Sequence, residues 1–144
     1  MGRILGIDVG TRTLGLAISD EGQRFALPLT TLRRAGLERD LRQLEELVRE
    51  REVVEAVVGL PLNLDGSPGA MEGEADLVAG ELGRRCAIPV QRWDERLTTV
   101  AAERALLEAD MSRRKRKLLV DKVAATLILQ AFLDRRALGG GAGR

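Results

Sequence analysis

The sequence predicts an α/β fold in which helices cover the faces of a five-stranded mixed sheet, with three antiparallel strands followed by two parallel ones. Two observations lead to this fold class. The chain begins with three apolar segments joined by short connections, which favours an antiparallel meander. It then alternates helical periodicity with short apolar segments, which favours parallel strands and right-handed crossovers. Its 144 residues, 44% of them hydrophobic, suit one domain with its own core.

The first three strands are expected before residue 34. Arg3–Val9 is an apolar segment that ends in a tight turn, and Leu14–Ser19 follows as the second strand of a hairpin. The third strand is expected over Phe25–Leu32. Pro28 favours an edge position for this strand, because proline has no N–H to donate to a second neighbour.

The periodicity changes after these strands. The run Val53–Val58 predicts an apolar strand covered on both faces. We expect residues 1–138 to form the domain and the glycine-rich residues 139–144 to be a flexible tail. The remaining elements are expected to be a helix over 37–48, a strand over 53–58, a helix over 71–85, a strand over 88–93 and two helices over 98–109 and 118–136.

The composition excludes several kinds of chemistry. The chain has no histidine, no tyrosine and one cysteine, Cys86, which we expect to be a buried apolar residue. This excludes Ser-His-Asp and Cys-His catalysis, His- or Cys-built zinc sites and a disulfide framework. Any catalysis is expected to use carboxylates and a cation that prefers oxygen ligands. No segment predicts a membrane span or a signal peptide, so we expect a cytoplasmic protein with no membrane partner.

Carboxylates occur at three places that could form a site. Asp8 lies in an apolar strand, where a charge is costly to bury unless it is paired or bound to metal; capping of the turn is the alternative. Asp94 and Glu95 follow the last strand, and alternation predicts that at most one of them shares a face with Asp8. The other would pair with Arg96 or cap a helix. The alternation of side chains along the strand does not decide which of Asp94 and Glu95 shares a face with Asp8.

Asp121 is the third place. Helical spacing puts it on one stripe with Ala125, Ile128 and Phe132, which suggests a charge that faces the core. Its alternative role is to complement the dipole at a helix N-terminus. Three acids on separate elements can meet at the carboxyl end of a sheet and bind Mg²⁺ or Mn²⁺. Two such ions about 3.5–4 Å apart would activate water and stabilise the leaving oxygen of a phosphodiester.

Four segments together resemble the YqgF family, also called RuvX, of Holliday-junction resolvases within the RNase H-like superfamily. The segments occur in the family's order and span most of residues 3–134. They are Gly6–Gly15, Val58–Gly66, Asp94–Thr99 and Val120–Ala125.

This resemblance implies an RNase H-like fold and a two-metal nuclease in which Asp8, Glu95 and Asp121 are the catalytic and metal-binding triad. It selects Glu95 over Asp94, which stays the alternative ligand. It also implies a role in maturing the 5′ end of pre-16S ribosomal RNA, with Holliday-junction resolution as the alternative. Resolution of a four-way junction needs two active sites on opposed strands, so it would favour a homodimer over a monomer.

Candidate nucleic-acid contacts complete the prediction. The net charge is only +1, but five consecutive basic residues precede the last predicted helix. They would contact phosphates beside the site, as would Arg12, although a solvated loop is the alternative for the basic run. Asn63 and Asp65, in a Gly/Pro-rich loop over 59–69, are candidates for the substrate groove. The basic run consists of Arg113, Arg114, Lys115, Arg116 and Lys117.

Two rival functions remain at this stage. The segment Gly6–Thr11 resembles the first phosphate loop of phosphotransferases of the actin, Hsp70 and sugar-kinase type. Those enzymes hold ATP between two lobes, and this chain supplies one. The other rival is a non-catalytic nucleic-acid-binding module in which the acids are structural.

Overall fold

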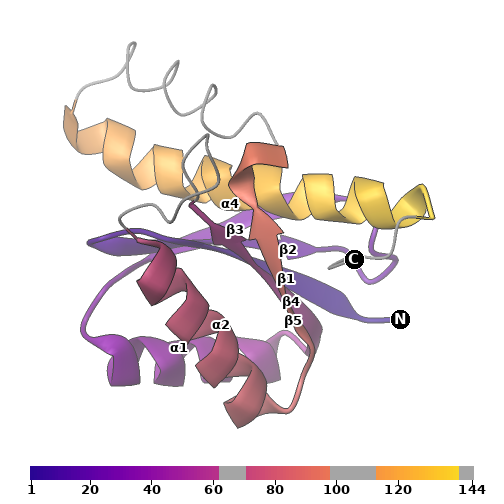
Figure 1. The fold of residues 1–144 in the computed structure, drawn as a ribbon, viewed down its shortest axis with the longest axis horizontal. Helices are drawn as coiled ribbons and strands as arrows, with labels where there is room; N and C mark the ends of the chain where they lie inside the picture. The colour runs from indigo at the N-terminus through magenta and orange to yellow at the C-terminus, as the bar shows by residue number, and fades with distance from the viewer. Residues whose placement is uncertain (62–70, 98–112, 140–144) are drawn as a thin grey trace.

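Five strands form one mixed sheet in the order β3–β2–β1–β4–β5 (Figure 1). The computed structural model describes residues 1–61, 71–97 and 113–139, with the backbone alone at 97 and 113–122. β1, β2 and β3 are antiparallel, while β4 is parallel to both β1 and β5. The predicted fold class is therefore confirmed. The strands are β1 (Arg3–Val9), β2 (Thr13–Ser19), β3 (Ala26–Arg33), β4 (Val53–Leu60) and β5 (Val90–Asp94).

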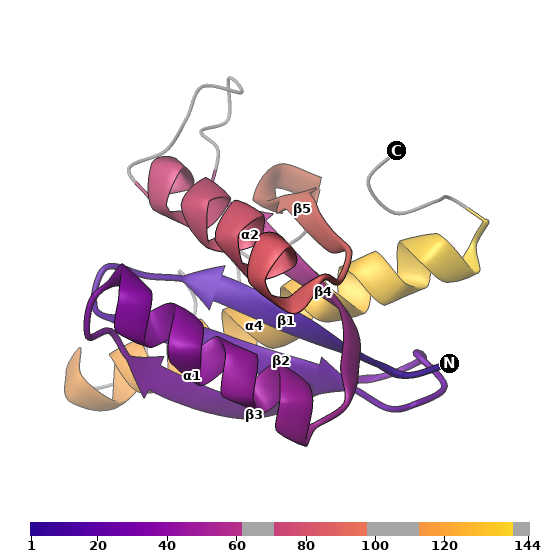
Figure 2. The ribbon, with the colours of Figure 1, turned by 90° about the horizontal axis from the view of Figure 1, so that it is seen from below.

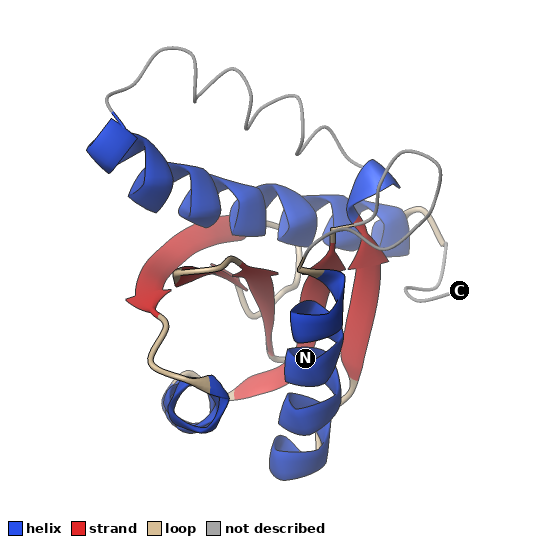
Figure 3. Cartoon of the chain, turned by 60° about the vertical axis from the view of Figure 1, so that its left-hand side comes forward, coloured by secondary structure: helices blue, strands red, loops and turns tan. Residues whose placement is uncertain are grey.

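Helices cover both faces of this sheet. α1 (Leu37–Glu50) and α2 (Glu72–Cys86) lie on one face, and α4 (Arg113–Ala137) crosses the other. Figure 2 shows α1 and α2 in front of the strands, and Figure 3 shows α4 on the far side of the sheet from them. A short 3₁₀ turn, η1 (Glu95–Leu97), follows β5. The helix predicted over 98–109 lies outside the described residues.

Each face of the sheet has its own hydrophobic core. Ile7 and Val58 belong to the core under α1 and α2. The core under α4 contains the buried side chains of Ala125, Ile128 and Phe132, so the predicted apolar stripe of this helix is confirmed. No helix in the described residues is both long enough and apolar enough to cross a membrane.

α4 lies so close to β1 that one strand position must be glycine. A Cβ atom added at Gly6 would lie 2.8 Å from Cβ of Leu129 and 3.1 Å from the carbonyl oxygen of Ala125. Both distances are shorter than ordinary van der Waals contacts, and neither neighbour is the flexible end of a long side chain. Gly6 therefore sets how closely the helix approaches the sheet.

β3 is one of the two edge strands, as Pro28 predicts, and its pairing with β2 is irregular beside the proline. Leu16 pairs with Thr30 while the next residue, Ala17, pairs with Pro28. The side chain of Gln130 in α4 forms hydrogen bonds with the backbone at the start of β3. It accepts a hydrogen bond from the Ala26 amide (2.8 Å) and donates one to the carbonyl of the residue at position 24 (3.0 Å).

Two details of the sequence prediction are wrong. α4 begins at Arg113, so the backbone of the basic run is part of the helix and not of a loop before residue 118. The strand over 53–58 is also not apolar throughout, because Glu55 is buried within it. Its carboxylate accepts two hydrogen bonds of 2.7 Å from Arg136 and one of 3.1 Å from Gln91. Burial disfavours the charge, but these bonds outweigh it and lower the pKa of Glu55.

Gly6→Ala is expected to lower the free energy of unfolding by about 1–3 kcal/mol, because the new methyl group collides with α4. Urea unfolding followed by circular dichroism measures this change. Gly73→Ala is the matched control, since a Cβ at Gly73 in α2 has nothing within 4 Å. The control should be neutral or stabilising by up to about 1 kcal/mol. Equal stability of the two variants would contradict the close approach of α4.

Glu55→Gln is expected to lower the free energy of unfolding by about 2 kcal/mol at pH 7, because Arg136 loses its charged acceptor. The pKa of Glu55 is lowered in the folded state from an ordinary value of 4.5. The ion pair therefore stabilises the fold fully above pH 4.5, and this contribution is lost as the pH falls through the lowered pKa. Unfolding measured from pH 7 down to about pH 2.5 should show the two proteins converging. A difference that is constant over this range would contradict the assignment.

Candidate active site

The carboxyl ends of three parallel strands lie side by side at one end of the sheet. β1 pairs with β4 through Ile7 and Val58, and β4 pairs with β5 through Gly59 and Trp93. Open α/β sheets place their sites at this end of parallel strands. Two of the three predicted carboxylates belong to it, one at the end of β1 and one directly after β5.

Asp8 points toward α4. Its neighbours Ile7 and Val9 belong to the core under α1 and α2, so alternation along β1 puts Asp8 on the opposite face, together with Gly6. The residue is 4% exposed. A carboxylate with so little access to water is retained only where a hydrogen bond, an ion pair or a cation compensates for the lost hydration.

Glu95 lies on the same face, above the strand that adjoins Asp8. A Cβ atom added at Gly59 would be 3.3 Å from Oε2 of Glu95 and 2.6 Å from Cδ1 of Ile128 in α4. The Glu95 carboxylate is therefore close to the end of β4, in space that any larger residue at 59 would occupy. Because β4 lies between β5 and β1, this carboxylate lies on the side of β5 that faces Asp8.

Asp94 has different surroundings. It follows Trp93, which belongs to the core under α4, so alternation turns Asp94 to the opposite face. Its carboxylate bonds the backbone amide of Arg96 at 2.9 Å and forms an ion pair of 2.6 Å with the same guanidinium. The side-chain bond from Arg96 is the main reason that the pKa of Asp94 is lowered. This geometry matches the pairing with Arg96 that the sequence left open for one of the two acids.

Residue 121 is the third predicted position, and the structure describes only its backbone, in α4. α4 ends near Glu55 at the beginning of β4, through Arg136, so its earlier turns extend toward the carboxyl ends of the strands (Figure 1). Asp121 precedes Ala125, which contacts β1 at Gly6, by one helical turn. The side chain of Asp121 lies outside the described residues. So do Asn63, Asp65 and the side chains of the basic run.

Three arginines lie around the turn between β1 and β2. Arg12, the residue predicted to contact a phosphate, is exposed in that turn. Arg33 is exposed at the end of β3, where it pairs with Thr13 across the ladder. The Arg34 side chain is mostly buried and forms ion pairs with Asp40 and Glu74. Sequence reasoning missed Arg33 and Arg34; the only signal is a pair of arginines directly after a strand.

Cys86, at the end of α2, is not an activated thiol. It is half-buried and packs against the core under α1 and α2, so it is less buried than the sequence predicts. Burial is the main cause that raises the pKa of this thiol, followed by the charge of Glu45. A raised pKa keeps the thiol protonated at neutral pH.

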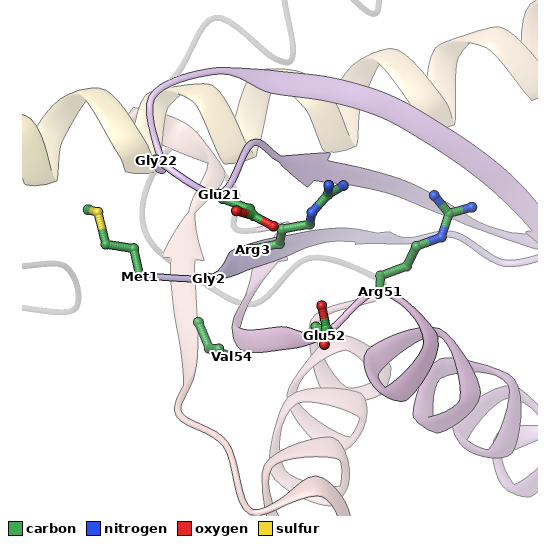
Figure 4. A pocket seen from close by; sticks show the side chains of 8 residues that line it. All are labelled: Met1, Gly2, Arg3, Glu21, Gly22, Arg51, Glu52 and Val54. Atoms are coloured by element: carbon green, nitrogen blue, oxygen red, sulfur yellow. The ribbon is translucent and has the colours of Figure 1, made fainter.

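A hollow of about 550 Å³ lies at the other end of the sheet, beside the start of β1 (Figure 4). Its polar lining has both signs of charge, from Arg3, Glu21, Arg51 and Glu52. Asp8 and Glu95 lie at the carboxyl ends of the strands, so the hollow is separate from the candidate active site.

The family of the chain follows from its sequence match. Residues 2–135 match the profile of RuvX, described as Holliday junction resolvase. The chain belongs to the RuvX family. A protein of Moorella thermoacetica named "Putative pre-16S rRNA nuclease" is 52% identical over 138 residues, which cover 96% of this chain and 99% of that protein. A Rhodobacter capsulatus protein of the same name is 48% identical over 137 residues, which cover 95% and 86% of the two chains.

Solved structures confirm the RNase H-like fold of this RuvX-family chain. The structure of T. thermophilus RuvC in complex with a Holliday junction substrate matches with a TM-score of 0.66 and 13% identity. The match covers 97% of this chain and 98% of that one. A second Thermus thermophilus RuvC structure, 15% identical, covers the same shares with a TM-score of 0.63. At these identities the likeness concerns the fold.

Gly59→Ala is expected to displace the Glu95 carboxylate, because the new methyl group takes the space beside Oε2 and Ile128. Both neighbours are ends of flexible side chains, so the free energy of unfolding should fall by only about 1 kcal/mol. A crystal structure of the variant and its urea unfolding curve measure the two effects. An unmoved Glu95 side chain would contradict the geometry described above.

Proposed function

We propose that this chain is a metal-dependent nuclease that hydrolyses phosphodiester bonds in the maturation of the 5′ end of pre-16S ribosomal RNA. One observation carries the proposal: Asp8 and Glu95 lie on one face of the sheet, at the carboxyl ends of parallel strands, with Gly59 between them. Relatives that are about 50% identical carry the name "Putative pre-16S rRNA nuclease", which supports the choice of substrate.

The proposed cofactor is Mg²⁺ or Mn²⁺, held by Asp8, Glu95 and Asp121. The available donors fit these ions, because carboxylate oxygens are their preferred protein ligands. Among the side chains that the structure describes, no three acidic or cysteine groups are close enough to hold a metal ion. The resemblance to the RuvX family implies that Asp121 is the third ligand. Two such ions, if held there, would lower the pKa of bound water and stabilise the leaving oxygen.

Other residues of the chain would orient the substrate and shape the space around Glu95. The absence of a side chain at Gly59 leaves room for the Glu95 carboxylate, while Arg96 holds Asp94 away from it. Arg12 and the basic run that begins α4 would contact phosphates of the nucleic acid. Binding should then weaken as salt rises, since each neutralised phosphate releases counterions.

Holliday-junction resolution is the second candidate function. The description of the RuvX family favours it, and so does the likeness of the fold to RuvC bound to a junction. A non-catalytic nucleic-acid-binding role is the remaining alternative.

Replacement of a proposed ligand should abolish cleavage. Loss of a residue that only orients a metal ligand costs about 10–100-fold in activity, so Asp8→Asn and Glu95→Gln should each cost more than about a hundredfold. Asp94→Asn is the matched control, because it removes an adjacent carboxylate that pairs with Arg96, and it should retain activity. Cleavage is measured in Mg²⁺ and in Mn²⁺, with chelator as the metal-free reference. Full activity of Asp8→Asn, or loss in Asp94→Asn alone, would contradict the site.

The same assay separates the candidate functions when it is run on two substrates. Preferential cutting of a 5′-extended 16S rRNA precursor supports RNA maturation, and preferential cutting of a four-way DNA junction supports resolution. Binding of both without cutting by the wild type, in either metal, supports the non-catalytic module.

A further inference from the structure

A single arginine holds the turn that follows Asp8. Within the turn, the Gly10 amide donates to the carbonyl of Thr13 at 2.9 Å. The Arg34 amide donates to the carbonyl of Arg12 at 2.8 Å. The Arg34 side chain adds a third bond, from Nη1 to the carbonyl of Gly10 at 3.2 Å.

Both helices on the other face of the sheet anchor this guanidinium. Its Nε bonds Oδ2 of Asp40 in α1 at 3.0 Å, and its Nη2 bonds Oε2 of Glu74 in α2 at 3.1 Å. The Asp40 side chain is only 1% exposed, and it also accepts a bond of 2.9 Å from the amide of Ala35. The two carboxylates therefore fix the position of Arg34, and through it the position of the Gly10 carbonyl.

We propose that Arg34 is a positioning residue, which sets the conformation of the turn over 10–13 so that Asp8 and Arg12 are presented together to the substrate. Gly10 lies two residues after Asp8 and two before Arg12, so a shift of the turn moves both. A role in stability alone would be satisfied by the pair with Asp40. The inference rests on the nuclease function proposed above.

The chain provides a matched control for this role. Arg136 forms a bidentate, mostly buried ion pair with Glu55, and this pair joins α4 to the start of β4, at the other end of the sheet from the turn. Arg34→Lys keeps a positive charge for Asp40. One ammonium group, however, cannot reproduce the planar guanidinium, which donates to three separate acceptors. Arg136→Lys makes the same chemical change away from the site.

Arg34→Lys is expected to lower kcat by about tenfold or more, since small displacements of reacting groups are costly, whereas Arg136→Lys should leave kcat near the wild-type value. Urea unfolding of both variants shows whether their stabilities fall equally. Amide hydrogen exchange at Gly10, measured by NMR, should become faster in Arg34→Lys only. If Arg34→Lys does not fold, Glu74→Gln weakens the same cluster at its more exposed partner and should produce the same changes to a smaller extent.

Equal losses of kcat in the two lysine variants, or unchanged exchange at Gly10 in Arg34→Lys, would overturn the positioning role. A wild-type protein that cuts neither substrate in either metal would instead refute the proposed function. In that case the exchange at Gly10 alone decides whether Arg34 holds the turn: faster exchange in Arg34→Lys supports this, and no change overturns it.

Discussion

The direct contact between α4 and the sheet is the constraint on which the candidate site depends. Two positions without side chains make it possible, Gly6 under Ala125 and Leu129, and Gly59 under Ile128. A helix held at the usual distance by larger residues would leave Asp8 beneath a gap that water could enter. The close contact instead brings α4 directly against β1, the strand that carries the buried carboxylate.

Ion pairs in this protein have distinct structural tasks. Glu55 and Arg136 join α4 to the start of β4, and Asp94 with Arg96 shapes the turn after β5. In both pairs the acidic partner, Glu55 or Asp94, is a residue other than the proposed metal ligands. These two ion pairs therefore connect or shape segments of the fold, while Asp8 and Glu95 lie on the face of the sheet that α4 covers.

Much of this architecture could be predicted from the sequence because it depends on local patterns. The strand bounds of β1 are those predicted, and Pro28 correctly indicated an edge. The start of α4 was missed because consecutive positive charges oppose the dipole at a helix N-terminus, so Arg113 did not look like a first residue. The burial of Glu55 was missed because its partner, Arg136, is 81 positions away in the chain.

The site shows the same limit. Alternation along a strand could not choose between Asp94 and Glu95, since their difference depends on the 3₁₀ turn and on the empty space at Gly59. Arg34 could not be found from spacing, because its acceptors Gly10, Asp40 and Glu74 come from three separate elements. Contacts between distant segments are the information that a single sequence lacks.

The bonds from Gln130 to the beginning of β3 have a consequence for self-association. A free sheet edge is a template on which another chain can add a strand, and such addition leads to aggregation. Here a glutamine side chain already occupies one end of that edge, and a proline and an irregular register interrupt it further along. Strand addition at β3 is thus disfavoured, and a twofold partner of this protein would need a different surface for its contacts.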